Sequence, residues 1–377
     1  MKTTIIIGAG ASGLLCGCEL AKHDENVIIL EQSNKSGRKI LASGNGRCNL
    51  SNLDLALSHY NTDDKKIANI IGYFDAREYF ESIGVMVKAN GKLLYPRSNQ
   101  SLTIKNALMN NFDNVALIEN CQALKITKQQ DGYLVTTNLG KYHGDNIVIA
   151  TGSKASGLSG TNNYDLVNQL GLQITKLAPS LVQLKTNPHY RQLKGVRIKC
   201  LASLLVDGKV IERQDGEVLF NEAGLSGICI MQLSRLLPHY QGKKEISLDL
   251  MPDFSYHELL DYLTRRKKQF GDYYFAGIFN DKLAKIIPEI DNIKDWRFKI
   301  VATGGFDKAQ VTSGGVSLQE VDENLESYQY PNLYLTGELL DVDGDCGGYN
   351  LHFAFASGYH VAKTILKKNE VEYVTNK

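Results

Sequence analysis

The segment TIIIGAGASG, residues 4–13, joins a short apolar run to a glycine-rich turn and decides the fold of this chain. Thr4–Ile7 is β-branched throughout and mostly apolar, which predicts a buried strand. A helix is expected over residues 14 to about 22, and a second buried strand over 27–30, followed by Glu31. Strand, G-x-G-x-x-G, helix, strand and acid, in this order, are typical of a βαβ unit that binds a dinucleotide.

Each part of this unit has a physical role in holding the ligand. Gly8 permits the tight turn, Gly10 lets backbone N–H groups approach a pyrophosphate, and Gly13 lets the helix pack close to the sheet. The helix N-terminus offers unpaired N–H groups and the positive end of its dipole to the phosphates. Glu31 can accept the ribose hydroxyls, an acid that a glycine-rich turn without a ligand would not need. The predicted residues are Gly8, Gly10, Ala11, Ser12, Gly13 and Glu31.

Length and composition argue against several classes of protein. The 377 residues are enough for two or more hydrophobic cores. Because the net charge is +1, no overall field attracts nucleic acid or a membrane surface, and we predict neither as a partner. No apolar run approaches the roughly 18 residues of a spanning helix. The N-terminus resembles a lipoprotein signal only superficially, since glycines at cofactor spacing interrupt its apolar part.

The cysteines are odd in number and scattered, and none forms a C-x-x-C pair. This pattern predicts reduced thiols and a cytoplasmic protein rather than a disulfide framework. It also lacks the redox pair that a flavin disulfide reductase needs. The seven are Cys16, Cys18, Cys48, Cys121, Cys200, Cys229 and Cys346.

The acid is followed by a loop rich in glycines and cations, GRKILASGNGRCNLSN, residues 37–52. Backbone donors and guanidinium groups in such a loop can hold a pyrophosphate from the side opposite the first helix. An ordinary surface loop is the alternative interpretation. The candidate residues are Gly37, Arg38, Lys39, Ser43, Gly44, Gly46, Arg47, Cys48 and Asn49.

Residues 37–39, Gly-Arg-Lys, resemble the second fingerprint of the glutathione-reductase-like FAD superfamily. The longer segment 37–52 resembles the signature of bacterial NAD(P)/FAD-dependent oxidoreductases described as HI0933-like or aminoacetone-oxidase-like proteins. The resemblance continues along most of the chain, through 93–98, 216–227, 309–316 and 341–351. It implies a non-covalently bound FAD.

The same resemblance implies further cofactor contacts after the first βαβ unit. It places the adenine against backbone near residue 122, and the end of the strand at 146–152 under the FAD. It also places a second helix N-terminus, within the segment 341–351, at the flavin pyrimidine, where N–H groups can stabilise the charge of reduced flavin. The residues so implied are Gln122, Ala123, Ala150, Thr151, Gly152, Gly337, Glu338, Asp343, Gly347, Gly348, Tyr349, Asn350 and Leu351.

The predicted fold class is α/β, a Rossmann-like FAD-binding domain of the glutathione-reductase type with an inserted β-rich domain and a small helical part. The expected boundaries are 1–177 and 313–377 for the FAD-binding domain, and 178–312 for the insertion. Within the first part, residues 54–118 are expected to be helical with a polar break at 90–92. An insertion beside the cofactor usually covers its reactive end, so we expect it on the substrate side.

Some residue patterns leave alternatives open. The basic run 265–268 is expected to be a solvated helix face. Asp341, Asp343 and Asp345 suggest calcium, but an EF-hand spacing would need glycine and glutamate where Cys346 and His352 stand, so no metal site is predicted. Cys346 is either a thiol near the flavin or a small packing residue. His352 either faces the substrate or is structural.

The predicted function is an FAD-dependent oxidoreductase that transfers hydride between a small molecule and flavin N5. No second strand–G-x-G-x-x-G–helix is present for NAD(P)H, which slightly favours an amine oxidase that uses O2. The alternative is a reductase of an activated double bond, with NAD(P)H as a transient electron donor. A tRNA-acting flavoprotein and a non-catalytic redox sensor are alternatives of other classes. The sequence identifies neither the catalytic side chains nor the oligomeric state.

Overall fold

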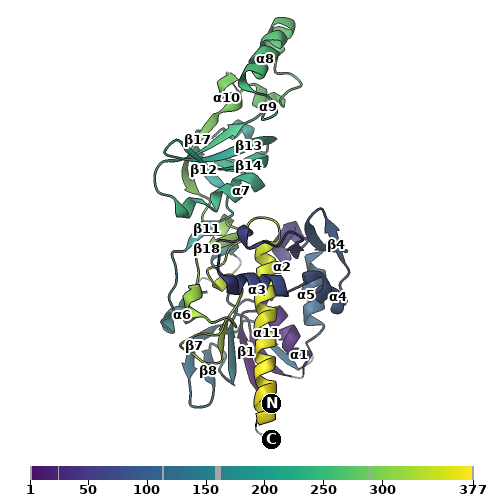
Figure 1. Ribbon diagram of the computed structural model, residues 1–377, viewed down its shortest axis with the longest axis vertical. Helices are drawn as coiled ribbons and strands as arrows, with labels where there is room; N and C mark the ends of the chain where they lie inside the picture. Colours follow the sequence, from purple (N-terminus) through teal and green to yellow (C-terminus); the bar gives the residue numbers. More distant parts are fainter. Residues whose placement is uncertain (1, 24, 113, 158–162, 288–289, 376–377) are drawn as a thin grey trace. The chain divides into compact units, whose positions relative to one another are not determined.

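A computed structural model describes residues 2–23, 25–112, 114–157, 163–287 and 290–375, in two compact units (Figure 1). The first unit comprises Met1–Ala178 and Val311–Lys377, and the second comprises Pro179–Gln310. Each unit has its own cluster of buried apolar side chains. The second unit is therefore an insertion with a separate core.

The first unit is built on a parallel sheet of five strands in the order β19-β10-β1-β2-β6. Its two N-terminal strands are the two predicted from the sequence, and the α/β fold class is confirmed. Ile5, Ile6 and Ile7 are buried, because helices cover the sheet. The strands are β1 (Thr3–Ile7), β2 (Asn26–Leu30), β6 (Val115–Ile118), β10 (Asn146–Ile149) and β19 (Leu333–Leu335).

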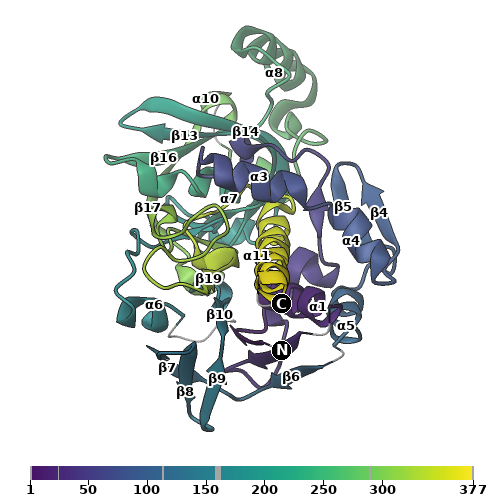
Figure 2. The same cartoon turned by 60° about the horizontal axis from the view of Figure 1, so that its bottom comes forward.

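Two helices are packed closely beside this sheet. α1 (Ala11–Ala21) follows the glycine turn and is buried along its whole length, against β1, β2 and α11 (Tyr349–Thr375). Figure 2 shows α11 lying beside α1. A Cβ on Gly358 of α11 would lie 2.3 Å from the Ser12 carbonyl oxygen, so this glycine permits the close approach.

The segment 54–118 is only partly helical, which corrects the prediction. The break at residues 90–92 is the turn of an antiparallel hairpin, in which Gly91 has φ +59°. Chain reversal there was missed because the flanking strands are short. The elements are β3 (Ser51–Asn52), α3 (Lys65–Tyr73), α4 (Ala76–Ser82), β4 (Val87–Asn90), β5 (Leu93–Pro96) and α5 (Ser101–Met109).

The rest of this unit consists of short elements. A three-stranded antiparallel sheet, β7-β8-β9, follows β6. The family resemblance also implies a helix over residues 154–172. In the described residues this helix is reduced to α6, and Gly160 and Thr161 lie outside them. The elements are α2 (Arg38–Ala42), β7 (Ala123–Lys128), β8 (Tyr133–Thr137), β9 (Lys141–Gly144), α6 (Asp165–Gln169) and β18 (Val311–Ser313).

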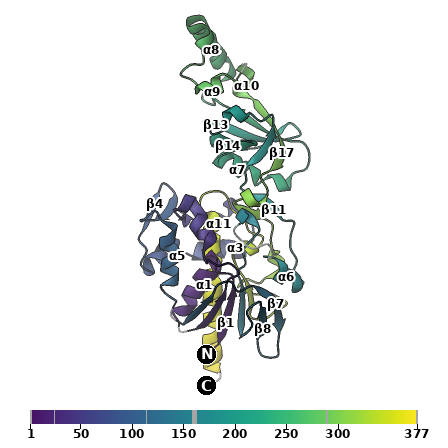
Figure 3. The same cartoon turned by 180° about the vertical axis from the view of Figure 1, so that it is seen from behind.

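The second unit contains a closed barrel in the order β12-β15-β14-β13-β16-β17. Phe220, Trp296 and Phe298 fill its core. The helices α8, α9 and α10 gather beyond one end of the barrel (Figure 3). The elements are β11 (Ala178–Ser180), β12 (Leu184–Asn187), β13 (Arg197–Val206), β14 (Lys209–Phe220), β15 (Gly224–Ser226), α7 (Ile228–Ser234), β16 (Lys244–Asp249), α8 (Tyr256–Phe270), α9 (Asp281–Ala284), α10 (Ile290–Lys294) and β17 (Trp296–Thr303).

The basic run lies on the last turns of α8. Arg265, Lys267 and Lys268 are exposed, as a solvated face requires. Arg266 is different, because its guanidinium donates to the carbonyl oxygens of Tyr274 (2.8 Å) and Ala276 (2.7 Å) and so holds the following loop. In the part of the chain that the structure describes, no helix is both long and apolar enough to cross a membrane.

Candidate functional site

The glycine turn, the acid and the start of the basic loop meet at the carboxyl ends of β1 and β2. The Ala9 N–H donates to one carboxylate oxygen of Glu31 (2.8 Å), and the Ser33 N–H donates to the other (2.8 Å). The Gly37 N–H donates to the Ala9 carbonyl oxygen (2.8 Å). The three sequence features are therefore parts of one site, at the edge of a parallel sheet where ligands usually bind.

The three glycines of the turn have different reasons to be glycine. A Cβ on Gly8 would lie 2.4 Å from the Ala150 oxygen, and one on Gly13 would lie 2.0 Å from the Gly8 oxygen. Packing of the protein itself therefore requires both. A Cβ on Gly10 would meet nothing within 4 Å, although Gly10 is the N-cap of α1 and offers no side-chain cap. An uncapped helix N-terminus with open space beside Gly10 can take a phosphate, so the residues present fit FAD.

The ends of β10 and β19 come close to the turn. Residues 150–152 continue β10, and the Ala150 N–H donates to the Ile7 carbonyl oxygen (2.8 Å). Gly337 follows β19 with φ +67°, and a Cβ there would lie 2.7 Å from the Ser12 hydroxyl of α1. Segments more than 300 residues apart thus border the same helix N-terminus.

Lys39 and Glu338 form an ion pair in this region. The Lys39 ammonium lies 2.6 Å from one carboxylate oxygen of Glu338 and 3.2 Å from the Ser153 hydroxyl. The other oxygen of Glu338 accepts the Thr312 N–H (3.0 Å). Lys39 was predicted to bind phosphate, but in the structure its charge is already paired. The sequence carries no signal for this pairing, because the two residues are 299 positions apart.

The remaining loop residues have different surroundings. Arg47 is exposed and lies over the Tyr95 ring, 5.2 Å from its centroid, and Arg38 is half-buried. No carboxylate among the described residues pairs with either guanidinium. Burial raises the pKa of Cys48 to about 12, so this thiol is a neutral packing group. The Ser43 hydroxyl donates to the backbone. The loop turns on residues with positive φ: Gly37, Gly44, Asn45, Gly46 and Cys48.

The loop before α11 is fastened to the segment that follows the basic loop. The Asn52 amide donates to the Gly347 carbonyl oxygen (3.0 Å), and the Asn49 amide, oriented to suit its neighbours, accepts the Gly348 N–H (3.1 Å). Asn350 closes the loop with its own amide, which accepts the Gly344 N–H at 2.7 Å. The two predicted cofactor loops therefore lie together.

The predicted adenine contact, Gln122, directly follows a residue that is hydrogen-bonded to the backbone of Glu31. The Cys121 N–H donates to the Glu31 carbonyl oxygen (2.8 Å), which places Gln122 beside this end of the sheet. The Gln122 N–H already donates to the Asn138 side chain (2.7 Å). An adenine held by backbone here would use Ala123, at the start of β7, rather than the Gln122 N–H.

His352 is a structural residue, which decides between the two interpretations left open by the sequence. It is fully buried, with Nδ1 2.8 Å from the Ser51 hydroxyl and Nε2 2.9 Å from the Ile71 carbonyl oxygen. Burial lowers its pKa to about 4, so the neutral ring donates from Nε2 and accepts at Nδ1. The preceding Leu351 also packs against the core.

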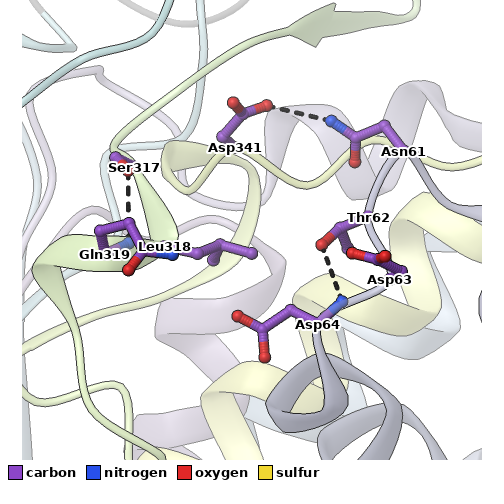
Figure 4. A pocket seen from close by; sticks show the side chains of 8 residues that line it. All are labelled: Asn61, Thr62, Asp63, Asp64, Ser317, Leu318, Gln319 and Asp341. Atoms are coloured by element: carbon purple, nitrogen blue, oxygen red, sulfur yellow. Dashed lines mark hydrogen bonds between the residues drawn. The ribbon is translucent and has the colours of Figure 1, made fainter.

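Asp343 is buried beside a polar cavity and not on its surface. Its N–H and carbonyl oxygen both bond Asn61, each at 2.9 Å, and the Asn61 amide also donates to Asp341 (3.0 Å). The cavity, of about 380 Å³, lies between Asn61 and residues 317–319 (Figure 4). No cluster of three or more metal-binding side chains occurs in the described ranges. The cavity lining is Asn61, Thr62, Asp63, Asp64, Ser317, Leu318, Gln319 and Asp341.

A histidine–aspartate pair that was not predicted from the sequence lies beside the loop before α11. His59 Nδ1 lies 2.9 Å from an Asp345 carboxylate oxygen, and the imidazole stacks on the Tyr349 ring with centroids 4.4 Å apart. The partners are 286 residues apart, so no local pattern could reveal the pair.

Residues 2–364 match the family model of the HI0933-like protein Rossmann domain. The chain belongs to the HI0933-like family. It is 33% identical over 394 residues to a 3-dehydro-bile acid delta(4,6)-reductase of Clostridium scindens, which covers 94% of this chain and 96% of that protein. It is 27% identical to a ribosomal RNA dihydrouridine synthase of Haemophilus influenzae, over 97% of this chain and 98% of that protein.

Solved structures show the same architecture. The open conformation of a flavocytochrome c3 fumarate reductase aligns with 97% of this HI0933-like chain and 78% of its own, with a TM-score of 0.50 and 15% identity. At this identity the likeness concerns the fold alone. The family match and the likeness to the bile acid reductase make this HI0933-like protein an enzyme, a flavin-dependent oxidoreductase.

Proposed function

We propose that this protein is an FAD-dependent reductase of carbon–carbon double bonds conjugated to a carbonyl group. The observation that carries the proposal is the likeness, along nearly the whole chain, to relatives named for two such reductions. A delta(4,6) double-bond system beside a 3-oxo group is conjugated with it, and so is the uracil double bond that dihydrouridine lacks. The substrates differ greatly in size, but the chemical operation is the same.

The reductase direction replaces the oxidase direction that the sequence slightly favoured. Neither of these relatives is named for an amine or for oxygen. NAD(P)H is the proposed electron donor, and it would dock transiently. The parallel sheet in the described residues has five strands and one glycine-rich turn at the end of β1. The described residues therefore contain no separate domain for binding a nicotinamide nucleotide.

FAD would supply the hydride, and the residues that would hold it belong to the first unit. The N-terminus of α1 beside Gly10 would bind the pyrophosphate, and Glu31 would accept the ribose hydroxyls. Arg38 and Arg47 are available to bind phosphate. Lys39 is paired with Glu338 and would contribute by holding that carboxylate in place. The N–H groups after Gly348 would face the pyrimidine and stabilise negative charge there.

We propose a small-molecule substrate. The similarity is 33% to the bile acid reductase and 27% to the dihydrouridine synthase, and the net charge of +1 supplies no general attraction for RNA. The second candidate is a uracil in RNA. It is favoured by two relatives with that name, from Haemophilus influenzae and from Escherichia coli, which align with 97% and 96% of this chain.

Anaerobic stopped-flow spectroscopy tests the proposal. The flavin is first reduced with NADPH or NADH, and is then mixed with 2-cyclohexen-1-one, 4-androstene-3,17-dione, uridine or an rRNA transcript. We expect saturable recovery of the absorbance near 450 nm with at least one enone, and slow recovery with uridine and RNA. Recovery with RNA alone would establish the second candidate. Flavin reduction by amines, with rapid reoxidation by O2 alone, would contradict both.

A further inference from the structure

We propose that His59, held by Asp345, is the proton donor for the double-bond reduction, an inference that rests on the proposed function. It adds an acid to a site in which the sequence identified no catalytic side chain. Hydride addition at the β-carbon pushes the double-bond electrons onto the carbonyl oxygen and leaves an enolate. The product forms only when a proton reaches the α-carbon, so the site needs a proton donor.

The loop before α11 fixes the imidazole from several sides. Asp345 accepts the proton of His59 Nδ1 at 2.9 Å, and its backbone N–H donates to the His59 carbonyl oxygen, also at 2.9 Å. Tyr60 and Gly344 form a bridge one residue further on. The Tyr349 ring lies against the imidazole face at an interplanar angle of 22°. These contacts orient the ring and leave Nε2 as the nitrogen that exchanges a proton.

The proposed position is beside the loop that would hold the flavin. Gly347 and Gly348 lie between Asp345 and Tyr349, the two residues that hold the ring. The His59 side chain is 28% exposed, so a ligand and solvent can both reach it. His59 is thus hydrogen-bonded to the loop that would contact the flavin, and its side chain remains accessible.

Other groups of this cluster are unsuited to the task. Burial raises the pKa of Tyr349 to about 12, and the Tyr60 hydroxyl donates to the Tyr349 carbonyl oxygen. Both nitrogens of His352 are occupied in the core. The charged groups that face His59 are Asp345 and, 3.9 Å from Nε2, Asp54, which is half-buried and paired with Lys92 at 2.7 Å.

The proton balance is simple. The Nε2–H bond breaks and a C–H bond forms at the α-carbon, while the enolate electrons return to close the carbonyl group. The imidazole is left neutral and regains its proton from solvent. The hydride comes from the reduced flavin, which NAD(P)H supplies with electrons under the proposed function. An Asp that holds Nδ1–H while Nε2 exchanges protons is a general arrangement for acid–base histidines.

The test separates the two half-reactions of the full-length holoenzyme. His59→Asn keeps an N–H near the position of Nδ1, and so keeps the bond to Asp345, but removes the acid. We expect FAD content, thermal stability and flavin reduction by NADPH to stay unchanged. Reoxidation by 2-cyclohexen-1-one or 4-androstene-3,17-dione should slow by about 100-fold or more.

Controls distinguish the possible failures. His360→Asn alters a histidine of the same unit that bonds only a backbone oxygen, at Glu323, and should leave both half-reactions unchanged. If His59→Asn reoxidises within about threefold of the wild-type rate, the proton-donor role is wrong and the proposed function stands. If the FAD content and the rates of both half-reactions fall together, His59 only holds the loop before α11 in place and is not the proton donor. If neither enone reoxidises the wild-type flavin, the proposed function fails, and the donor role with it.

Discussion

At the scale of single residues, identical residue types in one motif have different physical causes. Gly8 and Gly13 are required by contacts within the protein, whereas Gly10 faces open space. A substitution at Gly10 therefore reports on the ligand, and a substitution at Gly13 reports on the fold. Such a distinction is needed before any variant of this motif can be interpreted.

Gly10→Val is expected to strip the flavin from a protein that still folds. A Cβ at this position has no protein atom within 4 Å, but the side chain would occupy the proposed place of the pyrophosphate at the N-terminus of α1. Loss of two charge-assisted hydrogen bonds, about 1.5–3 kcal/mol each, lowers FAD affinity by more than roughly 100-fold. The measurement is the ratio of absorbance at 450 nm to that at 280 nm, with a thermal melt.

Gly72→Val is the matched control, because Gly72 is exposed in α3 and also has nothing within 4 Å of its Cβ position. It should retain its full complement of FAD. Retention of stoichiometric FAD by Gly10→Val would show that the turn does not bind the pyrophosphate.

His352 is expected to make the protein less stable in mild acid. Its pKa is about 4 in the fold and about 6.5 in the unfolded chain, so the unfolded state binds more protons between these values. Its contribution is fully present above pH 6.5 and is lost as the pH falls towards 4. Between pH 7 and pH 5 the loss is about 2 kcal/mol.

Urea denaturation of the wild type and of His352→Asn at pH 7 and pH 5 measures this effect. The variant is expected to be less stable at pH 7, because it lacks the imidazole whose two nitrogens bond the Ser51 hydroxyl and the Ile71 carbonyl oxygen. Its stability should also change less on acidification. Equal pH dependence in the two proteins would contradict a buried neutral imidazole.

At the scale of elements, the site depends on how closely α1 and α11 pack. The two helices carry the two N-termini that would face FAD, at its pyrophosphate and at its pyrimidine. Their close approach depends on a small residue of α11, Gly358, which lies against the Ser12 backbone. A change far from any ligand atom can therefore move both ends of the cofactor site.

Gly358→Ala is expected to destabilise the fold and weaken FAD binding together. Its Cβ would lie 2.3 Å from the Ser12 carbonyl oxygen, so the helices must separate. Such overpacking costs about 1–3 kcal/mol. Thermal melts with and without added FAD measure the effect. Gly72→Ala is the control, and should raise stability by up to about 1 kcal/mol, because alanine is the better helix former. An unchanged melt for Gly358→Ala would contradict the close packing.

At the scale of the whole molecule, the insertion can be separated from the nucleotide-binding unit. Its first and last barrel strands, β12 and β17, are antiparallel neighbours, with Leu184 opposite Thr303. Its two ends are therefore close together, and its core is separate from that of the first unit. We therefore expect each unit to fold without the other.

Replacement of Pro179–Gln310 by a short Gly-Ser linker should leave a protein that folds and remains yellow. All the proposed FAD contacts lie in the first unit, so FAD content should stay within about twofold of the wild type. Enone reduction should be lost, because the insertion is the proposed substrate side. The separate fragment 179–310 should unfold cooperatively by circular dichroism. A colourless first unit would show that the insertion completes the cofactor site.

The sequence by itself determined the features that depend on neighbours along the chain. The strand, turn and helix of residues 3–21, the parallel α/β class, the β-rich middle section and the family all follow from local patterns and motifs. These patterns are informative because periodicity and glycine spacing express local backbone geometry. The hairpin at 87–96 was missed, since its strands of four residues are too short to show an alternating pattern.

Only the tertiary structure decided which side chains meet. It pairs Lys39 with Glu338 and His59 with Asp345, it makes His352 a core residue, and it separates Gly10 from the other glycines of its motif. Residues nearly 300 positions apart become neighbours because a parallel sheet brings together the ends of strands from distant parts of the chain. The local sequence around either residue of such a pair does not indicate that the two residues are in contact.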